Sequence, residues 1–527
     1  MSAIRSSKLL LLAVVAVMAA GVFFRFYNID KKLLWHDEVY TKFFAAGSRS
    51  SLWKAKIFTG RVMDIKEVKA LQKNDPHKGV TDTIMGLALD EPQHPPLYYV
   101  LARLWVSWFG DDIGTLRLLS ALLSLFALPA IFWLSRELFT SVKIAWLSVI
   151  LLSASPFFVL FAQETREYTL WGLVILLSSA SMLRAIRLSM DDASSGTTVL
   201  CAWGLYMLFV TMAMYTSFSS VFVIMLQVLF ILTHQRLKIT RVNILSAISL
   251  TLSAFAFLPW ALVFADHYEA FRASMAWSRK IVIPRGQLLS TLGLNTSRPL
   301  VDFWRGYDGL ATVVGVGLSI LLIVISLAVL YRKAPKTSTV FVFSLILLPI
   351  AVLIVPDLMF GGIRSVSARY LTPSMLGIII AVAHLLGAKI KFTKAQAALT
   401  VVVVSIAMGS CAWNSPRVSV WTKGISYDLP RIANIINTSP SALVVGDQER
   451  HNPGNMLALV YLLKPGTRVQ FITTEQGYSL PEDPGDVYLF SPTNQFRKTI
   501  ERQHAKTVLV FKDIYLELWK VVPGSLT

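Results

Sequence analysis

Long apolar runs separated by short polar segments make up most of this chain. A bilayer core of roughly 30 Å is crossed by about 20 apolar residues in helical conformation. Eleven runs meet or nearly meet that length, and the weakest are the two that flank position 216 and the run 340–356. In chain order the runs span residues 8–26, 116–134, 144–162, 168–186, 198–215, 217–233, 244–264, 311–331, 340–356, 371–387 and 396–413. This pattern predicts a mainly α-helical, polytopic membrane protein with about 11 transmembrane helices.

A further apolar segment, PPLYYVLARLWVSWFG at 95–110, is too short for a crossing. As a helix it reaches only about 24 Å, and Arg103 stands near its middle. Tyr and Trp residues lie toward its ends, which is typical of an amphipathic helix in the membrane interface. The segment therefore predicts an interfacial helix within a long first external loop, 27–115.

The distribution of charge supports this topology. The chain has a formal net charge of +19, with 54% hydrophobic and only 15% charged residues. If 95–110 does not cross, the loops on the side of the N-terminus hold fifteen Lys and Arg residues but only three Asp and Glu residues. Such an excess marks the cytoplasmic face. We therefore expect a cytoplasmic N-terminus and an extracytoplasmic first loop and tail, and the basic charge needs no nucleic acid to explain it.

The tail, 414–527, lacks long apolar runs and is richer in Pro, Gly, Asp and Asn. Strand-like pieces, namely ALVVGD, VQFITT, DVYLF and TVLVF, alternate with helical stretches such as RIANIINT and FRKTIERQH. Alternation of this kind predicts a small α/β domain. The expected organisation is a transmembrane domain over 1–413, which includes the external loop, and a soluble extracytoplasmic α/β domain over 414–527.

Ionisable residues gather on the predicted external side, where they mark a site in a membrane protein. The acidic pair Asp37–Glu38 lies in WHDEVY near the start of the first loop, and DEPQHPPLYY (90–99) lies near its end. Further groups stand in AQETREYTL (162–170), ADHYEAFR (265–272) and RSVSARYLTP (364–373). Each has an ordinary structural explanation, since acids cap helices and arginines reach lipid headgroups. Together they predict one external site.

One acidic pair, a histidine and several arginines suit transfer from a lipid-phosphate-linked sugar. The phosphate leaves readily, so one carboxylate acting as base on an acceptor hydroxyl is enough, whereas a glycosidase needs two carboxylates. Cationic side chains or a metal would bind the phosphate and stabilise its charge as it departs. Glu91 and His94 are residue types suited to a divalent metal, and Pro92 and Pro95 bracket them.

The order of these motifs resembles that of the C-type integral-membrane glycosyltransferases. One N-terminal span is followed by the acidic pair, then by E-x-x-H-P-P-L-Y-Y, and then by Arg117, which opens the second span. The chain is similar to the bacterial relatives of the protein O-mannosyltransferases and of the aminoarabinose lipid A transferases. The likeness is strongest over 30–175 and extends, as hydropathy, to 413, and it does not include the tail. It implies a polyprenyl-phosphate sugar as donor, an external active site and inversion at the anomeric carbon.

The resemblance also implies roles for individual residues. Asp37 corresponds to the catalytic base and Glu38 to a supporting acid. Glu91 and His94 fall where the family has a block near the donor phosphate or a metal, and His94 replaces a lysine of the aminoarabinose branch. His267 would be a further metal ligand.

The cationic residues of the other motifs are expected around the donor phosphate. The phosphate-binding residues that we expect are His94, Arg117, Arg166, Arg364, Arg369 and Tyr370. Arg369 and Tyr370 belong to an R-Y-x-x-P element that resembles the family's. Glu164 and Tyr168 belong with Arg166 to a turn similar to Q-E-x-R-x-Y, and we expect them to line the site.

On these grounds we expect an enzyme of a bacterial inner membrane that transfers one sugar from a polyprenyl phosphate to a hydroxyl of a protein, lipid or glycan. Membrane lipids, the donor and an unidentified acceptor are its expected partners, and a divalent metal ion is a candidate cofactor. The alternative is a flippase or transporter of lipid-linked glycans, which would place polar residues along a path through the bilayer. A membrane sensor whose tail binds a ligand is a third hypothesis.

Overall fold

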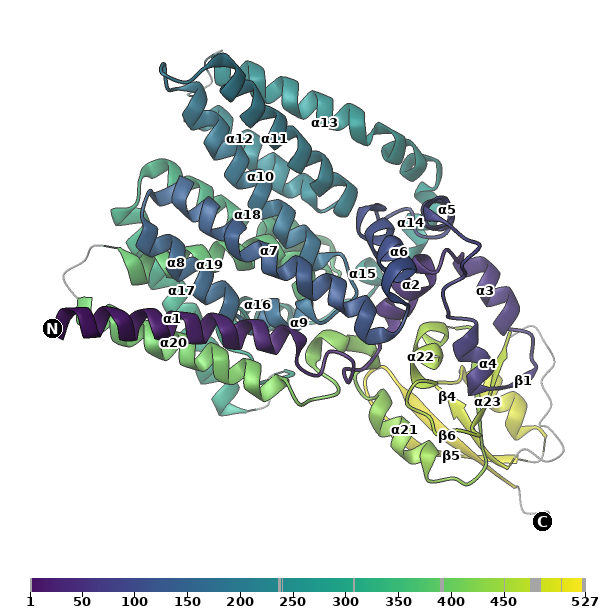
Figure 1. The fold of residues 1–527 in the computed structure, drawn as a ribbon. Helices are drawn as coiled ribbons and strands as arrows, with labels where there is room; N and C mark the ends of the chain where they lie inside the picture. Colours follow the sequence, from purple (N-terminus) through teal and green to yellow (C-terminus); the bar gives the residue numbers. More distant parts are fainter. Residues whose placement is uncertain are drawn as a thin grey trace. The chain divides into compact units, whose positions relative to one another are not determined.

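The chain folds into two compact units (Figure 1). The computed structural model describes residues 2–235, 238, 240–306, 309–388, 393–449, 451–473, 485–503 and 505–523. The helical unit comprises Met1–Ile29, Glu91–Tyr98 and Arg117–Pro416, and the sheet unit comprises Asp30–Asp90, Tyr99–Leu116 and Arg417–Thr527. This grouping differs from the expected domains, because most of the first loop belongs with the tail and not with the transmembrane helices.

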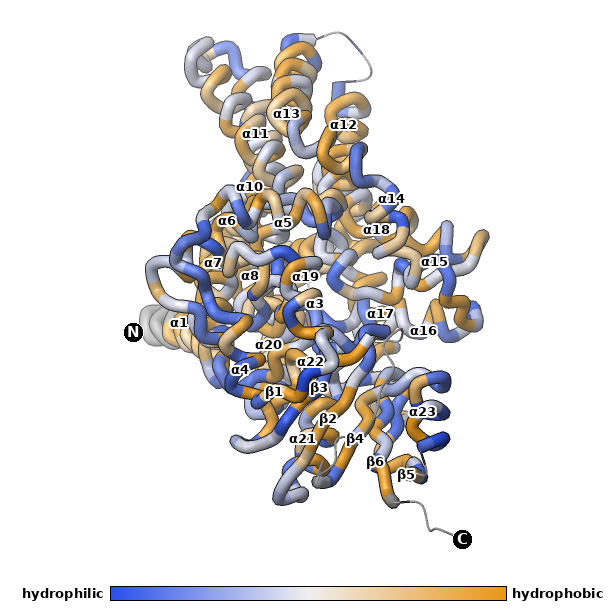
Figure 2. The backbone as a smooth tube through the Cα atoms, turned by 90° about the vertical axis from the view of Figure 1, so that its right-hand side faces the viewer, coloured by the Kyte–Doolittle hydropathy of each residue, from blue (hydrophilic) through white to orange (hydrophobic). Residues whose placement is uncertain are grey.

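The helical unit contains long apolar helices joined by short turns. Its longer helices are α1 (Ser2–Phe26), α7 (Ile113–Phe139), α10 (Tyr168–Ser189), α11 (Gly196–Thr216), α12 (Ser220–His234), α13 (Arg241–Asp266), α17 (Leu310–Lys333), α18 (Lys336–Phe360), α19 (Thr372–Gly387) and α20 (Thr393–Asn414). The shorter elements are α8 (Val142–Ala154), α9 (Pro156–Ala162), α14 (Tyr268–Ser274), α15 (Trp277–Lys280), α16 (Arg285–Ser297), η1 (Arg364–Val366) and η2 (Ala368–Leu371). Figure 2 shows that apolar residues dominate long helices such as α11, α12 and α13, whereas the short α14 and α15 are more polar.

Many of these helices are long and apolar enough to cross a membrane. Among the described residues eight helices meet that condition, and α8 with α9 makes a ninth if the bent pair is one span. The two other predicted runs correspond to shorter apolar helices, Val14–Phe26 within α1 and Ser220–His234. The mainly helical membrane-spanning architecture is therefore confirmed, while the total of eleven crossings stays a prediction.

Helices α10 and α19 lie in the interior of the helical unit. Every residue of α19 is buried, and a helix that is apolar all round is expected to be enclosed by others. The break between α8 and α9 falls at Ser155–Pro156, where the two helix axes bend by 57°. Proline lacks the N–H of a helix interior, and it disfavours helical conformation at the preceding residue. Ser155 accordingly has the extended angles φ −65° and ψ 118°.

The sheet unit takes its elements from both ends of the chain. The first loop provides α2 (His36–Ala45), α3 (Ser50–Ile57), β1 (Val62–Asp64), α4 (Ile65–Ala70), α5 (Val80–Asp90) and most of α6 (Leu97–Phe109). The tail provides η3 (Trp421–Ser426), α21 (Leu429–Asn437), β2 (Ala442–Asp447), α22 (Asn452–Leu459), β3 (Arg468–Ile472), β4 (Asp486–Phe490), α23 (Asn494–Glu501), β5 (Ala505–Lys512) and β6 (Glu517–Pro523).

These strands form one six-stranded mixed sheet in the order β1-β3-β2-β4-β6-β5. Strand β2 pairs in parallel with β3 and with β4, and the other pairings are antiparallel. Strand β1 comes from the first loop and pairs with β3 through Val62–Gln470, Met63–Val469 and Asp64–Arg468. The tail therefore does not complete the sheet by itself.

Both faces of the central strand β2 are covered. Alternate side chains of a strand point to opposite faces, and Leu443 and Val445 lie in a cluster with Phe496 and Ile500 of α23. The side chains on the other face enter a larger core, to which the first loop and the tail both contribute. Within this core the rings of Phe43 and Trp53, both from the first loop, stack with their centroids 4.6 Å apart.

Arg103 has a structural role within the sheet unit. Helix α6 has 13 residues, and the Arg103 side chain is buried. Its guanidinium donates hydrogen bonds to the Asn74 side chain and to the backbone carbonyls of Ala45, Asp75 and Lys78. Arg103 thus connects α6 to the end of α2 and to the loop between α4 and α5.

The shared core yields a prediction about cooperativity. Trp53→Ala empties a site in the first loop that is 3% exposed, and we expect a loss of about 3–5 kcal/mol from such a truncation. Hydrogen exchange should then become faster in β2 and β3 of the tail as well as in the loop. The control is Leu52→Ala at the neighbouring residue, which is 50% exposed. Unchanged protection of β2 and β3 in Trp53→Ala would show that loop and tail unfold separately.

Candidate active site

The acidic pair Asp37–Glu38 lies in the first turn of α2. Acidic side chains at this end of a helix are stabilised by the helix dipole and the unpaired N–H groups. Residue Trp35 precedes the helix in extended conformation, with φ −115° and ψ 171°. Successive residues of a helix point about 100° apart, so the two carboxylates face different surroundings.

Glu38 faces the interior of the sheet unit. Its Oε2 lies 3.2 Å from Nζ of Lys423 in η3, and the two side chains are 0% and 1% exposed. A charge buried in this way is costly unless it has a partner, and removal of one partner typically costs about 3–5 kcal/mol. The geometry therefore gives Glu38 a structural contact that the sequence analysis did not anticipate, because Lys423 lies far away along the chain.

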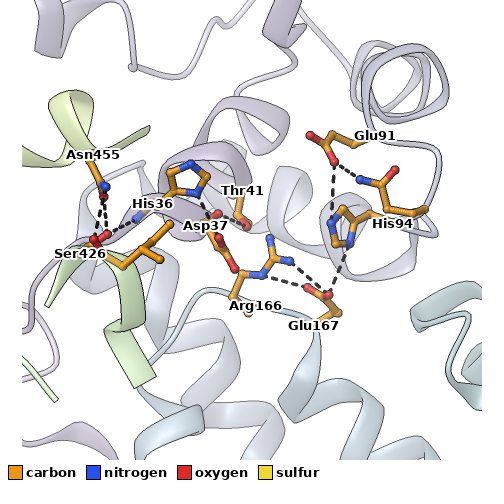
Figure 3. A network of polar contacts seen from close by, with 11 residues as sticks. His36, Asp37, Thr41, Glu91, His94, Arg166, Glu167, Ser426 and Asn455 are labelled. Atoms are coloured by element: carbon orange, nitrogen blue, oxygen red, sulfur yellow. Dashed lines mark hydrogen bonds and ion pairs between the residues drawn. The ribbon is translucent and has the colours of Figure 1, made fainter. Parts of the chain in front are cut away.

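Asp37 keeps partial access to solvent, with 20% of its side chain exposed. Its Oδ1 lies 3.2 Å from Nδ1 of His36 (Figure 3). The backbone carbonyl of Asp37 accepts a hydrogen bond from the Thr41 hydroxyl at 3.2 Å. An oriented carboxylate that remains accessible meets the basic requirement for a general base.

In the helical unit the turn between α9 and α10 holds a buried ion pair. Arg166 Nε lies 3.2 Å from Glu167 Oε2, and Arg166 Nη2 donates to Glu167 Oε1 at 3.3 Å. The preceding Gln163 side chain donates to the carbonyls of Phe24 and Tyr27 at 2.9 and 2.8 Å. These bonds fix the turn to the C-terminal end of α1, where backbone carbonyls lack helical partners.

His94 joins this ion pair from the E-x-x-H-P-P segment. Its Nδ1 lies 3.5 Å from Glu167 Oε1, and its Nε2 lies 4.0 Å from Glu91 Oε2 (Figure 3). Burial by itself would raise the pKa of Glu167, but the charge of Arg166 and the hydrogen bond from His94 lower that pKa to about 2. Glu167 was not among the predicted site residues, and its position beside Arg166 in QETREY was the only available signal.

Aromatic rings extend the network. The guanidiniums of Arg166 and Arg369 each lie 5.7 Å from the centroid of the Tyr168 ring. Arg369 also lies 5.4 Å from the ring of Tyr370. Of the predicted phosphate-binding residues, the structure thus joins His94, Arg166, Arg369 and Tyr370 in one network through Glu167 and Tyr168. We call this set the arginine network.

The other predicted residues make the following contacts. Arg117 is fully buried, and its Nη1 donates to the carbonyl of Ile29 at 2.9 Å. Arg364 Nη1 lies 2.7 Å from Asp357 Oδ1, an ion pair at the end of α18. Glu164 is buried in the same turn as Arg166 and accepts a hydrogen bond from the Arg166 N–H through its backbone carbonyl.

The predicted metal ligands do not form one cluster. His267 Nδ1 lies 3.1 Å from the carbonyl of Val263 in α13. Within the described part of the chain, no group of three or more His, Cys, Asp or Glu side chains is arranged to hold a metal ion. Glu91 and His94 are neighbours, but His267 does not complete a three-ligand set with them.

A small apolar pocket lies within the helical unit. Its walls include Phe157, Phe161, Leu173 and Leu376, together with Tyr168. Tyr168 therefore belongs both to the arginine network and to the wall of the pocket. An anionic group bound by the network and an apolar chain in the pocket would share this residue.

The low pKa of Glu167 predicts a pH dependence of stability. A carboxylate whose pKa falls on folding stabilises the protein fully above its ordinary value of 4.5, and the stabilisation is lost as the pH falls toward about 2. Between these limits wild type should lose about 1.4 kcal/mol of unfolding free energy per pH unit from this group. Thermal unfolding in detergent at several pH values measures the slope. Glu167→Gln should lack this component and Glu91→Gln should keep it, and equal slopes in all three proteins would contradict the assignment.

The chain is similar to known proteins in part of its sequence and in its fold. Residues 93–262 match the family model described as dolichyl-phosphate-mannose-protein mannosyltransferase. The apo crystal structure of ArnT from Cupriavidus metallidurans is similar to this chain with a TM-score of 0.57 at 12% identity, over 98% of each chain. ArnT from the same organism bound to undecaprenyl phosphate gives a TM-score of 0.53 at 13% identity, over 97% of each chain. A comparison with curated proteins gave no match. Residues 93–262 are thus similar to the protein mannosyltransferase family, and the chain as a whole shares the fold of ArnT.

Proposed function

We propose that this protein transfers a sugar from a polyprenyl phosphate to an acceptor hydroxyl, with inversion and with Asp37 as the base. Its relation to the mannosyltransferases and ArnT supports a lipid-linked glycosyltransferase. The choice of donor rests on Tyr168, which belongs to the arginine network and also lines the apolar pocket. A polyprenyl phosphate combines an anionic head with an apolar tail, and Tyr168 would contact such a ligand where the two meet.

The charge of the arginine network suits a phosphate group. Glu167 contributes one negative charge against the two guanidiniums of Arg166 and Arg369, so these three residues carry a net positive charge. Guanidinium groups bind phosphate oxygens in a planar, two-pronged geometry. The burial of Arg166 and Glu167 reduces competition from water, which strengthens such contacts. The undecaprenyl phosphate bound to ArnT from Cupriavidus metallidurans supports the same ligand class for this chain.

The proposed reaction is a single displacement. The acceptor oxygen forms a bond to the anomeric carbon while the bond from that carbon to the phosphate oxygen breaks. The acceptor proton passes to the Asp37 carboxylate, and the polyprenyl phosphate departs with one additional negative charge. The arginine network stabilises this developing charge. Attack opposite to the leaving phosphate inverts the anomeric configuration, and the distribution of basic loops supports an extracytoplasmic site.

The base is tested by a transfer assay. Asp37→Asn keeps the shape of the side chain but cannot accept the acceptor proton, so we expect the transfer rate to fall by about 10²–10⁴-fold. The assay follows radiolabelled sugar from a panel of polyprenyl-phosphate sugars into acceptors of the membrane fraction. The control is Asp30→Asn, an acid of the same segment whose side chain is 54% exposed.

Transfer by Asp37→Asn at the wild-type rate would overturn the assignment of the base. Movement of the labelled lipid across the membrane without formation of a new glycoside would instead favour a flippase or transporter. The two outcomes are separated by treating the product with mild acid, which releases sugar from the phosphate but not from an ordinary glycoside.

The phosphate site is tested without knowledge of the sugar. Undecaprenyl phosphate should raise the unfolding temperature of wild type, since a ligand at about 100 times its Kd stabilises the folded state by about 2.7 kcal/mol. Arg369→Ala should lose most of this shift, and Arg369→Lys should keep part of it because the charge remains but the planar stacking does not. Arg272→Ala, at a side chain that is 59% exposed, is the matched control. A full shift in Arg369→Ala, or an equal shift with undecaprenol, would contradict this site.

A further inference from the structure

His36 is a neighbour of the candidate base to which the sequence analysis gave no role. Its Nδ1 lies 3.2 Å from Asp37 Oδ1, and its side chain is largely buried, with 17% exposed. We propose that His36 is a positioning residue for Asp37. Residues of the tail in and next to η3 and α22, namely Ser426, His451, Gly454 and Asn455, hold His36 in its orientation. We call these four residues the His36 seat. This inference rests on the proposed function, in which Asp37 is the base. In this proposal the tail contributes to catalysis, because it orients the residue next to the base.

The backbone of His36 is held by the tail. Its N–H donates to the hydroxyl of Ser426 at 3.0 Å (Figure 3). Ser426 in turn donates to Oδ1 of Asn455 at 2.6 Å, and Nδ2 of Asn455 donates to the carbonyl of Ile425 at 3.3 Å. Ser426 and Asn455 are fully buried. The first residue of α2 is therefore fixed by a closed set of bonds from η3 and α22.

Two neighbouring aromatic rings restrict the imidazole ring of His36. The His451 ring meets it edge to face, with the centroids 5.6 Å apart and the planes at 89°. On its own helix the Tyr40 ring lies 5.1 Å away. Aromatic pairs in tilted and edge-to-face arrangements are favourable beyond their buried area. The two contacts leave the ring little freedom to rotate away from Asp37.

Gly454 provides the space in which the ring lies. A β-carbon at position 454 would stand 2.4 Å from His36 Cδ2 and 3.0 Å from Nε2, too close for a real contact. Gly454 lies within α22, where glycine is less favourable than alanine by roughly 0.5–1 kcal/mol. Its backbone does not need a left-handed conformation, because Gly454 is not among the positive-φ residues. The close approach of His36 is thus the physical reason for glycine here.

The ion pair of Glu38 with Lys423 fixes the direction of the same turn. Lys423 belongs to η3, which also contains Ser426. With Glu38 directed into the sheet unit, the neighbouring Asp37 is directed about 100° away around the helix axis. The tail therefore sets both the rotation of α2 and the side chain next to the base.

Substitutions of His36 separate positioning from packing. His36→Ala removes the hydrogen bond to Asp37, and we expect kcat to fall about tenfold or more, because a hydrogen bond to a charged group is worth that much. His36→Asn keeps an N–H donor near the position of Nδ1 and should recover most of the wild-type kcat. The KM for the polyprenyl-phosphate sugar should stay within about twofold in both, since the donor phosphate contacts are unchanged.

Gly454→Ala tests the seat from the tail. The added methyl group must displace the His36 ring, so kcat should fall to a similar degree with little change in donor KM. In the double variant His36→Ala/Gly454→Ala the second change should have no further effect, because the ring that it displaces is absent. The matched control is Gly204→Ala, since a β-carbon on this helical glycine of α11 would meet nothing within 4 Å.

The outcomes distinguish this inference from the proposed function. Full-length protein is assayed in detergent, and the thermal shift with undecaprenyl phosphate shows that each variant is folded. If Asp37→Asn is inactive while His36→Ala and Gly454→Ala keep the wild-type kcat, the positioning role of His36 is contradicted and the assignment of Asp37 as the base is kept. If the kcat of His36→Asn is as low as that of His36→Ala, His36 has a packing role and does not position Asp37. The same conclusion follows if the losses from His36→Ala and Gly454→Ala add in the double variant. Wild-type transfer by Asp37→Asn would overturn the base itself.

Discussion

The buried ion pair of Glu38 with Lys423 joins two parts of the chain that are 385 residues apart in sequence. Both side chains are almost completely buried, and the removal of one partner of a buried ion pair costs several kcal/mol. The helix that begins at His36 and the η3 segment of the tail must therefore fold against each other. Ser426, from the same η3 segment as Lys423, binds the His36 N–H, and Asn455 binds Ser426.

The same rule about buried polar groups shapes the helical unit. The break at Pro156 leaves the carbonyls of Leu152 and Ser153 at the end of α8 without helical partners. Arg25 of α1 donates to both of them at 3.0 and 2.8 Å, and to the Ser124 hydroxyl at 3.1 Å. The helix break at Pro156 thus leaves carbonyl groups in α8 that accept hydrogen bonds from the buried Arg25 of α1. The Arg166–Glu167 pair satisfies the same requirement in the turn before α10.

The sequence was informative wherever one local pattern decided the outcome. Uninterrupted apolar runs predicted the long helices, and the block around His94 carried the family relationship that the match over 93–262 supports. Contacts between distant segments left no local trace. Lys423 has no periodicity that points to Glu38, and β1 is a three-residue strand in a polar loop whose partner lies in the tail. Glu167 was not predicted as a site residue, because nothing in the sequence places His94 beside it. The roles of Asp37, Arg117 and His267 in the reaction remain predictions.

The antiparallel pairing of β1 with β3 has a consequence for biosynthesis. Val62 and Gln470 are about 400 residues apart, and a ribosome that adds roughly 5–20 residues per second needs on the order of 20–80 s to make the intervening chain. During that time the first loop has left the ribosome without the strands that complete its core, and Phe43 and Trp53 lack their final partners. Non-local pairing of this kind also slows folding after synthesis. The first turn of α2 therefore gains its contacts with Lys423 and Ser426 of the tail only after nearly the whole polypeptide has been made.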